Sequence, residues 1–199
     1  MTASANNSPT ALAALDQRRS VPARQLGPPG PDEATLLRML QSAVRVPDHG
    51  KRVPFRFIRV AGGSAVRLGE ALAALTLARD PEATPAALEK DRQRFTHAPL
   101  VIVVVAVLDP ADGQIPELER LLSAGSVCFA LLQAAQALGF GACWLTGWPA
   151  HDPEAQRLLG LAGHEQVAGF IHIGTRVQEA PERNRPDPRT LLQDLVLGQ

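Results

Sequence analysis

Two arginines followed by a serine are the first residues in this chain that could do chemistry. Arg18, Arg19 and Ser20 directly follow a short helix predicted over 11–17. Guanidinium groups bind phosphate and carboxylate through paired, charge-assisted hydrogen bonds, and a neighbouring hydroxyl adds a further donor. The triplet is therefore suited to an anionic ligand, although a plain surface turn can have the same composition.

Two later segments carry further polar and aromatic groups. The loop RVPDHGKR supplies Arg45 and His49 around a rigid proline, and the segment WLTG supplies Trp144, Leu145 and Thr146. The histidines show no HExxH or other paired spacing, which predicts no metal site. The serines lack the context of a nucleophile elbow. Together with the arginine pair, the two segments favour an anionic, planar cofactor.

A long apolar helix is predicted just before the WLTG segment. In its part GSVCFALLQAAQAL the polar side chains are Ser126, Gln133 and Gln136, which fall within one arc of roughly 80°. A helix this apolar is buried, either in a domain core or against a partner subunit. Gly139 is expected to end it, and a strand predicted over 140–145 then leads to WLTG.

The remaining elements must position these groups. Leu100 to Leu108 is a β-branched run that predicts a central strand covered on both faces. The charged run EKDRQR, from Glu89 to Arg94, is interpreted as a solvated helix face. His172 lies in a strand predicted over 169–174 and is interpreted as a packed core histidine. The other elements are predicted as a helix over 31–44, a strand over 55–60, helices over 64–78 and from 84, and a short helix over 153–161.

Composition bounds the class of protein. The 199 residues suffice for one domain with a sizeable core, and 20 Lys and Arg balance 20 Asp and Glu. Zero net charge predicts no nucleic-acid and no membrane partner. The first ten residues lack signal-peptide features, and Cys128 and Cys143 form no disulfide framework, so we expect a cytoplasmic protein. We expect a loose segment over 1–10 and a single domain over 11–199.

The order of the motifs along the chain resembles the flavin-dependent nitroreductase family, and most closely its short bacterial branch. RRS is followed by PDHG, PFRF, LGFGACWLTGW, GFIHIGT and a basic, proline-rich tail, so that the resemblance runs from about Ala11 to Asp187. It implies an α+β fold with a mixed sheet of four to five strands flanked by helices. It also implies a homodimer with the helix over 116–138 in the interface and the tail over 175–199 reaching the partner subunit.

The resemblance further implies one FMN per subunit, bound between the two chains. Arg18, Arg19 and Ser20 would hold its phosphate, ribityl chain and pyrimidine edge. The nicotinamide donor would lie near 134–139. The further FMN contacts implied are Arg45 from the same chain, His49 from the other subunit, Trp144, Leu145 and Thr146 along the flavin, and Arg183 and Arg185 at the phosphate.

By the same resemblance, the protein is an FMN-dependent NAD(P)H oxidoreductase. Hydride would pass from NADH or NADPH through FMN to a small nitroaromatic or quinone-like acceptor with ping-pong kinetics. This transfer depends on stacking geometry, so no catalytic side chain is named. Two alternatives remain: a flavin-binding homodimer with little or no turnover, and an α/β domain in which RRS and PDHG are only turns.

Overall fold

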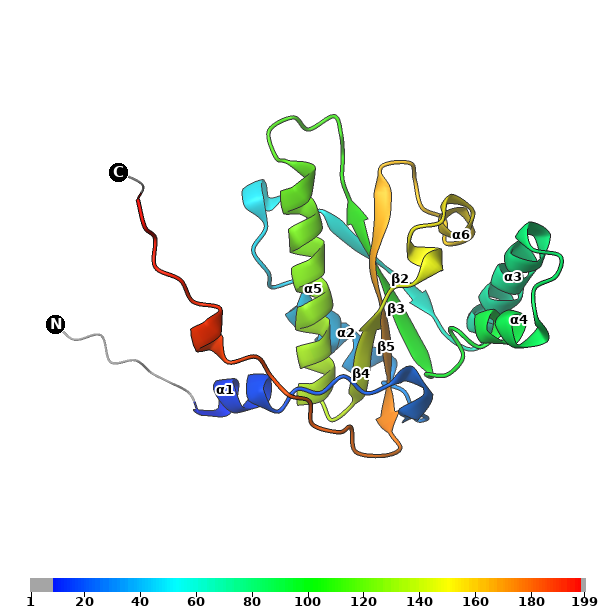
Figure 1. The fold of residues 1–199 in the computed structure, drawn as a ribbon, viewed down its shortest axis with the longest axis horizontal. Helices are drawn as coiled ribbons and strands as arrows, with labels where there is room; N and C mark the ends of the chain where they lie inside the picture. The colour runs from blue at the N-terminus through cyan, green and yellow to red at the C-terminus, as the bar shows by residue number, and fades with distance from the viewer. Residues whose placement is uncertain (1–8, 198–199) are drawn as a thin grey trace.

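A five-stranded sheet with helices on both faces makes up the fold that the computed structural model describes for residues 9–197 (Figure 1). The strands are β1 Leu26–Gly27, β2 Phe55–Val60, β3 Leu100–Val107, β4 Gly141–Leu145 and β5 Glu165–Arg176. The α-helices are α1 Pro9–Asp16, α2 Glu33–Ala43, α3 Gly63–Arg79, α4 Pro85–Arg92, α5 Glu117–Ala137 and α6 Pro153–Leu158. Short 3-10 helices are η1 Ala23–Gln25, η2 His49–Lys51, η3 Trp148–Ala150 and η4 Pro188–Thr190.

The long strand β5 determines the topology of the sheet. Its residue Ile171 pairs with Ile102 of β3 on one edge and with Trp144 of β4 on the other. β3 and β4 therefore run in the same direction, joined by the crossover helix α5, and β5 lies between them antiparallel to both. The α+β class and the number of strands agree with expectation. The sheet is antiparallel at each pairing described rather than mixed, because β5 separates the two strands that the crossover makes parallel.

Strand β3 confirms the prediction of a central strand covered on both faces. The side chains of Ile102 and Val104 lie in a core cluster with residues of α2 and α5, whereas those of Val101 and Val103 lie in a second cluster with residues of α3. All four are buried. This alternation follows from the two-residue period of a strand, and it places α5 and α3 on opposite faces of the sheet (Figure 1).

Helix α5 is apolar on two sides. One side packs against the sheet, and the other is exposed. Cys128 and Leu131 are buried against the sheet, whereas Leu118 and Leu122 are 64% and 60% exposed. The helix is long and apolar enough to cross a membrane by length and composition, but 50% of its most apolar window is buried in the protein. Gly139, with φ of +86°, follows it as predicted.

The chain ends differ in detail from the sequence prediction. β5 continues to Arg176 because the short strand β1 pairs with its last two residues, so the tail begins at Val177 rather than at Thr175. α1 begins at Pro9. The remainder of the segment expected to be loose, 1–8, lies outside the described residues. The apolar residues of the tail from Leu191 to Leu197 are exposed.

His172 of β5 is a core histidine, as predicted. It is 0% exposed, its ring stacks on Phe95 with centroids 6.2 Å apart, and both ring nitrogens lack a hydrogen-bond partner among the described residues. Burial, together with the nearby charges of His97 and Arg94, lowers the pKa of His172 to about 4. The native protein therefore holds this imidazole in its neutral form.

Because of His172, the free energy of unfolding depends on pH. Because the pKa of His172 is lower in the native state than in the unfolded chain, where histidine titrates near 6.5, protonation favours unfolding. The contribution of His172 to the free energy of unfolding is therefore full above about pH 6.5. It falls as the pH is lowered towards 4, by about 3 kcal/mol in all. We expect His172→Phe to flatten this part of the pH profile in urea unfolding. An unchanged slope between pH 6.5 and 4 would contradict the assignment.

Candidate functional site

Four of the predicted arginines meet in one pocket. Arg18 and Arg19 follow α1, while Arg183 and Arg185 come from the C-terminal tail, and all four line a pocket of about 710 Å³. The other lining residues are Leu15, Asp16, Phe129, Glu182 and Asn184. Residues more than 160 positions apart in sequence thus form a single cationic site, a grouping that the family resemblance implies.

Positive charges outnumber negative charges in this arginine pocket. Burial lowers the pKa of Arg18, and the nearby Arg185, Arg19 and Arg183 lower it further. Glu182 forms ion pairs with Arg19 and, at 3.4 Å, with Arg185. Four guanidinium groups therefore outnumber the two carboxylates of the lining, Asp16 and Glu182. Such an excess of forked cations suits a ligand with several anionic oxygens, such as a phosphate.

Ser20 contacts the Arg18 side chain, and Val21 fixes the backbone that directly follows the triplet. Arg18 donates a hydrogen bond to Ser20 Oγ at 3.3 Å. The Val21 amide donates to the Ala142 carbonyl at 3.0 Å, and the Val21 side chain is buried. The triplet is thus held between α1 and the start of β4 and is an ordered segment.

A second, apolar pocket lies beside the WLTG segment. It has a volume of about 690 Å³ and is lined by Trp144 and Thr146 together with Leu121, Leu122, Gly125, Ser126, Phe129, His151, Gln166, Val167 and Ala168. Leu145 is not among the lining side chains, since alternate residues of a strand point to opposite faces. We call this space the tryptophan pocket.

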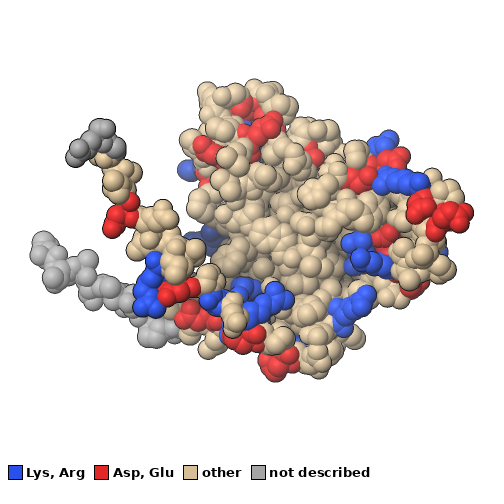
Figure 2. Space-filling view, viewed as in Figure 1, with Lys and Arg blue, Asp and Glu red and all other residues tan. Residues whose placement is uncertain are grey.

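The arginine pocket and the tryptophan pocket share one residue. Phe129, on the exposed side of α5, lines both of them. Figure 2 shows few charged atoms over the middle of this face of the molecule, with basic side chains gathered near the end of α5 that meets α1. The arrangement has an anion-binding end and an apolar end, so it fits an elongated ligand with a phosphate on one side and a planar ring on the other.

The structure does not bring Arg45 and His49 to this arrangement within one chain. His49 Nδ1 lies 2.6 Å from Glu119 Oε2, and the Ser123 hydroxyl donates to the Pro47 carbonyl at 2.7 Å. Their loop is therefore attached to the N-terminal half of α5. The arginine pocket is at the other end, where Gln136 donates to the Ala14 carbonyl at 3.1 Å. From 119 to 136 a helix extends about 25 Å.

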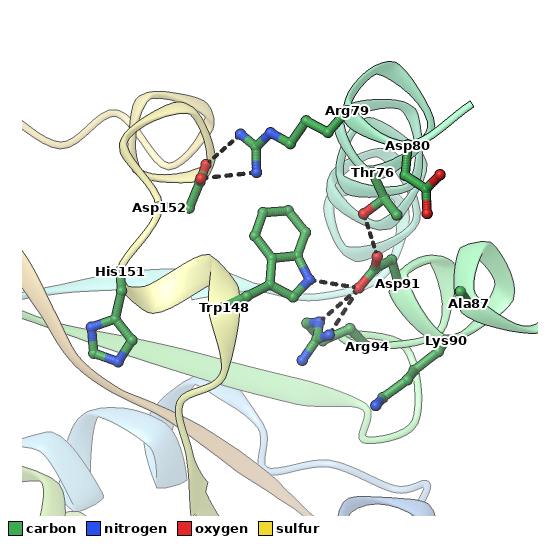
Figure 3. A pocket seen from close by; sticks show the side chains of 10 residues that line it. All are labelled: Thr76, Arg79, Asp80, Ala87, Lys90, Asp91, Arg94, Trp148, His151 and Asp152. Carbon is green, nitrogen blue, oxygen red and sulfur yellow. Dashed lines mark hydrogen bonds and ion pairs between the residues drawn. The ribbon is translucent and has the colours of Figure 1, made fainter. Parts of the chain in front are cut away.

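A third pocket, of about 600 Å³, lies between α3, α4 and η3 (Figure 3). At its centre the Asp91 carboxylate, 4% exposed, accepts hydrogen bonds from Thr76 at 2.7 Å, Trp148 at 3.0 Å and Arg94 at 2.8 Å. Burial alone would raise the pKa of Asp91, but these hydrogen bonds outweigh it and the pKa is lowered. The interpretation of EKDRQR as a solvated face is therefore wrong for Asp91.

Most charged side chains at the centre of this third pocket are paired with one another. Arg79 pairs with Asp152 at 2.8 Å and lies 5.4 Å above the Trp148 ring, and Arg94 is paired with Asp91. In Figure 3 the His151 ring stands apart from this network, and no interaction reaches it. The network joins α3 and α4 to η3, so we assign it a structural role. Among residues 9–197, no group of His, Cys, Asp and Glu is arranged to hold a metal ion.

Known proteins resemble this chain in both sequence and structure. The model of the nitroreductase family matches residues 15–175. A Haemophilus influenzae protein provisionally named an NAD(P)H nitroreductase is 33% identical over 175 residues, covering 88% of this chain and 93% of that protein. The structure of a nitroreductase-like family protein from Bacillus cereus matches with a TM-score of 0.78 and 23% identity over 100% of both chains. A Desulfovibrio desulfuricans protein, provisionally named a nitroreductase and solved in complex with FMN, matches with a TM-score of 0.70 and 22% identity over 93% of this chain and 96% of that one.

Proposed function

Since the chain belongs to the nitroreductase family, we propose that it is an FMN-dependent NAD(P)H oxidoreductase acting on small nitroaromatic or quinone-like compounds. The observation that carries this proposal is the arginine pocket joined through Phe129 to the tryptophan pocket. When bound, FMN would accept a hydride from NADH or NADPH and pass it to the acceptor in a second, ping-pong half-reaction. The relative's name and the FMN-bound structure support this choice of donor and cofactor.

The residues of this chain would bind and orient the cofactor. Arg18, Arg19, Arg183 and Arg185 supply the cations for its phosphate, and Ser20 supplies a hydroxyl beside them. Trp144, Leu145 and Thr146 would line the ring through the backbone of β4 and its exit loop. The apolar walls of the tryptophan pocket keep water from the reacting ring. No described side chain is required to act as acid or base.

The site is completed, in this proposal, by a second copy of the chain. The exposed apolar residues of α5 form a continuous surface of the kind that marks a protein interface. If two α5 helices pack antiparallel about a twofold axis, the His49 loop of one chain lies beside the arginine pocket of the other. Arg45 shares that loop, so we propose that it too comes from the partner rather than from the same chain. The exposed tail from Val177 would extend onto the partner surface.

Mixing two defective variants tests this shared site. Neither an Arg18→Ala/Arg19→Ala homodimer nor a His49→Ala homodimer should retain FMN. After unfolding and refolding together, half of the dimers are mixed and each contains one intact site, so about a quarter of all sites should bind FMN. Absorbance of the desalted mixture at 450 nm measures this. If every contact came from one chain, no site would recover.

The visible spectrum of the purified protein tests the activity itself. We expect a flavin spectrum that bleaches within seconds of adding NADH or NADPH without oxygen and returns on adding menadione. A flavin that stays oxidised would favour the flavin-binding homodimer without turnover. A protein that takes up no FMN would overturn the proposal.

The cysteines support a reducing compartment, and we propose the cytoplasm. Cys128 and Cys143 are both buried free thiols, and burial raises the pKa of each to about 12. A buried thiol with a raised pKa is unreactive, because the thiolate is the nucleophile. The two cysteines are therefore core residues rather than redox groups.

A further inference from the structure

We propose that the indole of Trp144 is a fixed stacking platform for planar, uncharged aromatic ligands, and that Gly169 is the positioning residue that holds it flat. This inference deepens the proposed function, on which it rests for the identity of the ligand as the acceptor. It assigns a role to the Trp144 side chain, in addition to the backbone contacts of β4 with the cofactor: the acceptor would lie between the indole and the flavin ring, and both rings would share the pocket of about 690 Å³.

The indole lies directly on the backbone of β5. Its Nε1 donates a hydrogen bond to the Ala168 carbonyl at 3.1 Å. A Cβ atom on Gly169 would lie 2.1 Å from Nε1 and 2.6 Å from Cδ1 of the same ring. That separation is far inside van der Waals contact, so the flat position of the indole exists only because residue 169 has no side chain. Any larger residue would lift the ring into the tryptophan pocket.

The far edge of the indole reaches α5. A Cβ atom on Gly125 would lie 3.8 Å from the Trp144 ring, which is an ordinary contact. The ring is thus held by a hydrogen bond and by the bare backbone of Gly169 at one edge, and lies near the helix at the other. Trp144 nevertheless remains 39% exposed and lines the pocket. One face of a preorganised aromatic ring is therefore available to a ligand, and preorganisation reduces the entropic cost of binding.

The chemistry of the pocket selects the class of ligand. The lining residues on α5 include the apolar side chains of Leu121, Leu122 and Phe129, and His151 is the one ionisable side chain among the lining residues. A charged ligand would lose its hydration there without a fixed counter-charge. An uncharged, electron-poor ring, as in a nitroarene or a quinone, stacks favourably on the electron-rich indole.

Fluorine NMR of the FMN-loaded protein tests the platform without turnover. The chain has two tryptophans, so 5-fluorotryptophan labelling gives two resonances, which Trp144→Phe assigns. Trp148, whose indole donates to the buried Asp91, is the internal control. We expect nitrobenzene to shift the Trp144 resonance saturably and to leave the Trp148 resonance in place. Nitrocyclohexane, similar in size but not planar, should bind about five- to tenfold more weakly.

Two glycine variants make a matched pair for the positioning role. Gly169→Ala should weaken nitrobenzene binding about tenfold and move the Trp144 resonance even without ligand. Gly163→Ala adds a Cβ atom that meets nothing within 4 Å, at a position outside both pockets, and should change neither by more than about twofold. If Gly169→Ala does not fold, Trp144→Leu should raise the KM for nitrobenzene about tenfold, and Trp144→Phe should restore most of the loss.

Several outcomes would overturn the platform. Equal binding of nitrobenzene and nitrocyclohexane would exclude stacking, and no shift of Trp144 would mean that the partner chain or FMN covers the indole. Failure of the proposed function looks different. In that case the wild type would not reduce ferricyanide with NADH or NADPH, an acceptor that needs no stacking site, whatever the fluorine spectra show.

Discussion

Replacing Arg18 and Arg19 together by alanine should weaken FMN binding at least about a hundredfold, because each guanidinium makes charge-assisted hydrogen bonds of about 1.5–3 kcal/mol to an anion. Both residues line the arginine pocket, and the Val21 amide fixes the backbone shortly after them. The variant should be purified colourless and should release FMN on desalting. Titration of apoprotein with FMN, followed by quenching of flavin fluorescence, gives the dissociation constant.

Two controls distinguish a specific phosphate site from a general loss of positive charge. Arg157 of α6 is 71% exposed and lies outside the arginine pocket, so Arg157→Ala should leave FMN binding unchanged. Glu182→Gln should have the opposite sign, because Glu182 pairs with Arg19 and competes with the phosphate for it. We expect this variant to bind FMN a few-fold more tightly. If the double alanine variant kept its flavin, the arginine pocket would not be the phosphate site.

The second large effect concerns stability. Asp91→Ala should lower the free energy of unfolding by about 3–5 kcal/mol, because it leaves the partly buried Arg94 guanidinium and the Trp148 N–H without their shared acceptor. For a domain of this size the melting temperature should fall by roughly 10 °C. Thermal unfolding followed by circular dichroism measures it.

Asp80 provides the matched control for this prediction. It lines the same pocket as Asp91 but is exposed, and its side chain accepts one hydrogen bond, from the Glu82 amide at 3.1 Å. Asp80→Ala should therefore change the melting temperature by no more than about 2 °C. Equal effects of the two substitutions would show that the Asp91 network does not stabilise the contact between α3, α4 and η3.

Local patterns in the sequence predicted those parts of the molecule whose causes are local. The β-branched run after Leu100 could only form a covered strand, and the apolar helix that Gly139 ends was visible from composition. Thr84 caps α4 as predicted, accepting from the Ala87 amide. The grouping of Arg18 with Arg183 was suggested by family resemblance, because no local rule relates residues so far apart.

The parts that were missed depend on long-range contacts. Asp91 sits in a run of charged residues that is typical of a solvated helix face, and only its contacts with Thr76 and Trp148 bury it. The antiparallel sheet follows from the insertion of β5 between β3 and β4, which no periodicity encodes. Likewise, Gly169 has no local signature, since its importance comes from an indole 25 residues earlier in the chain.

The insertion of β5 also has a consequence for how the chain is made. β3 is complete at Val107, but the strand that covers its second edge begins only at Glu165. At synthesis rates of about 5–20 residues per second, that edge waits roughly 3–12 s for its neighbour. An apolar strand with an open edge is prone to pair with other chains. The open edge of β3 is therefore the part of the nascent chain most exposed to pairing with other chains until β5 has been synthesised.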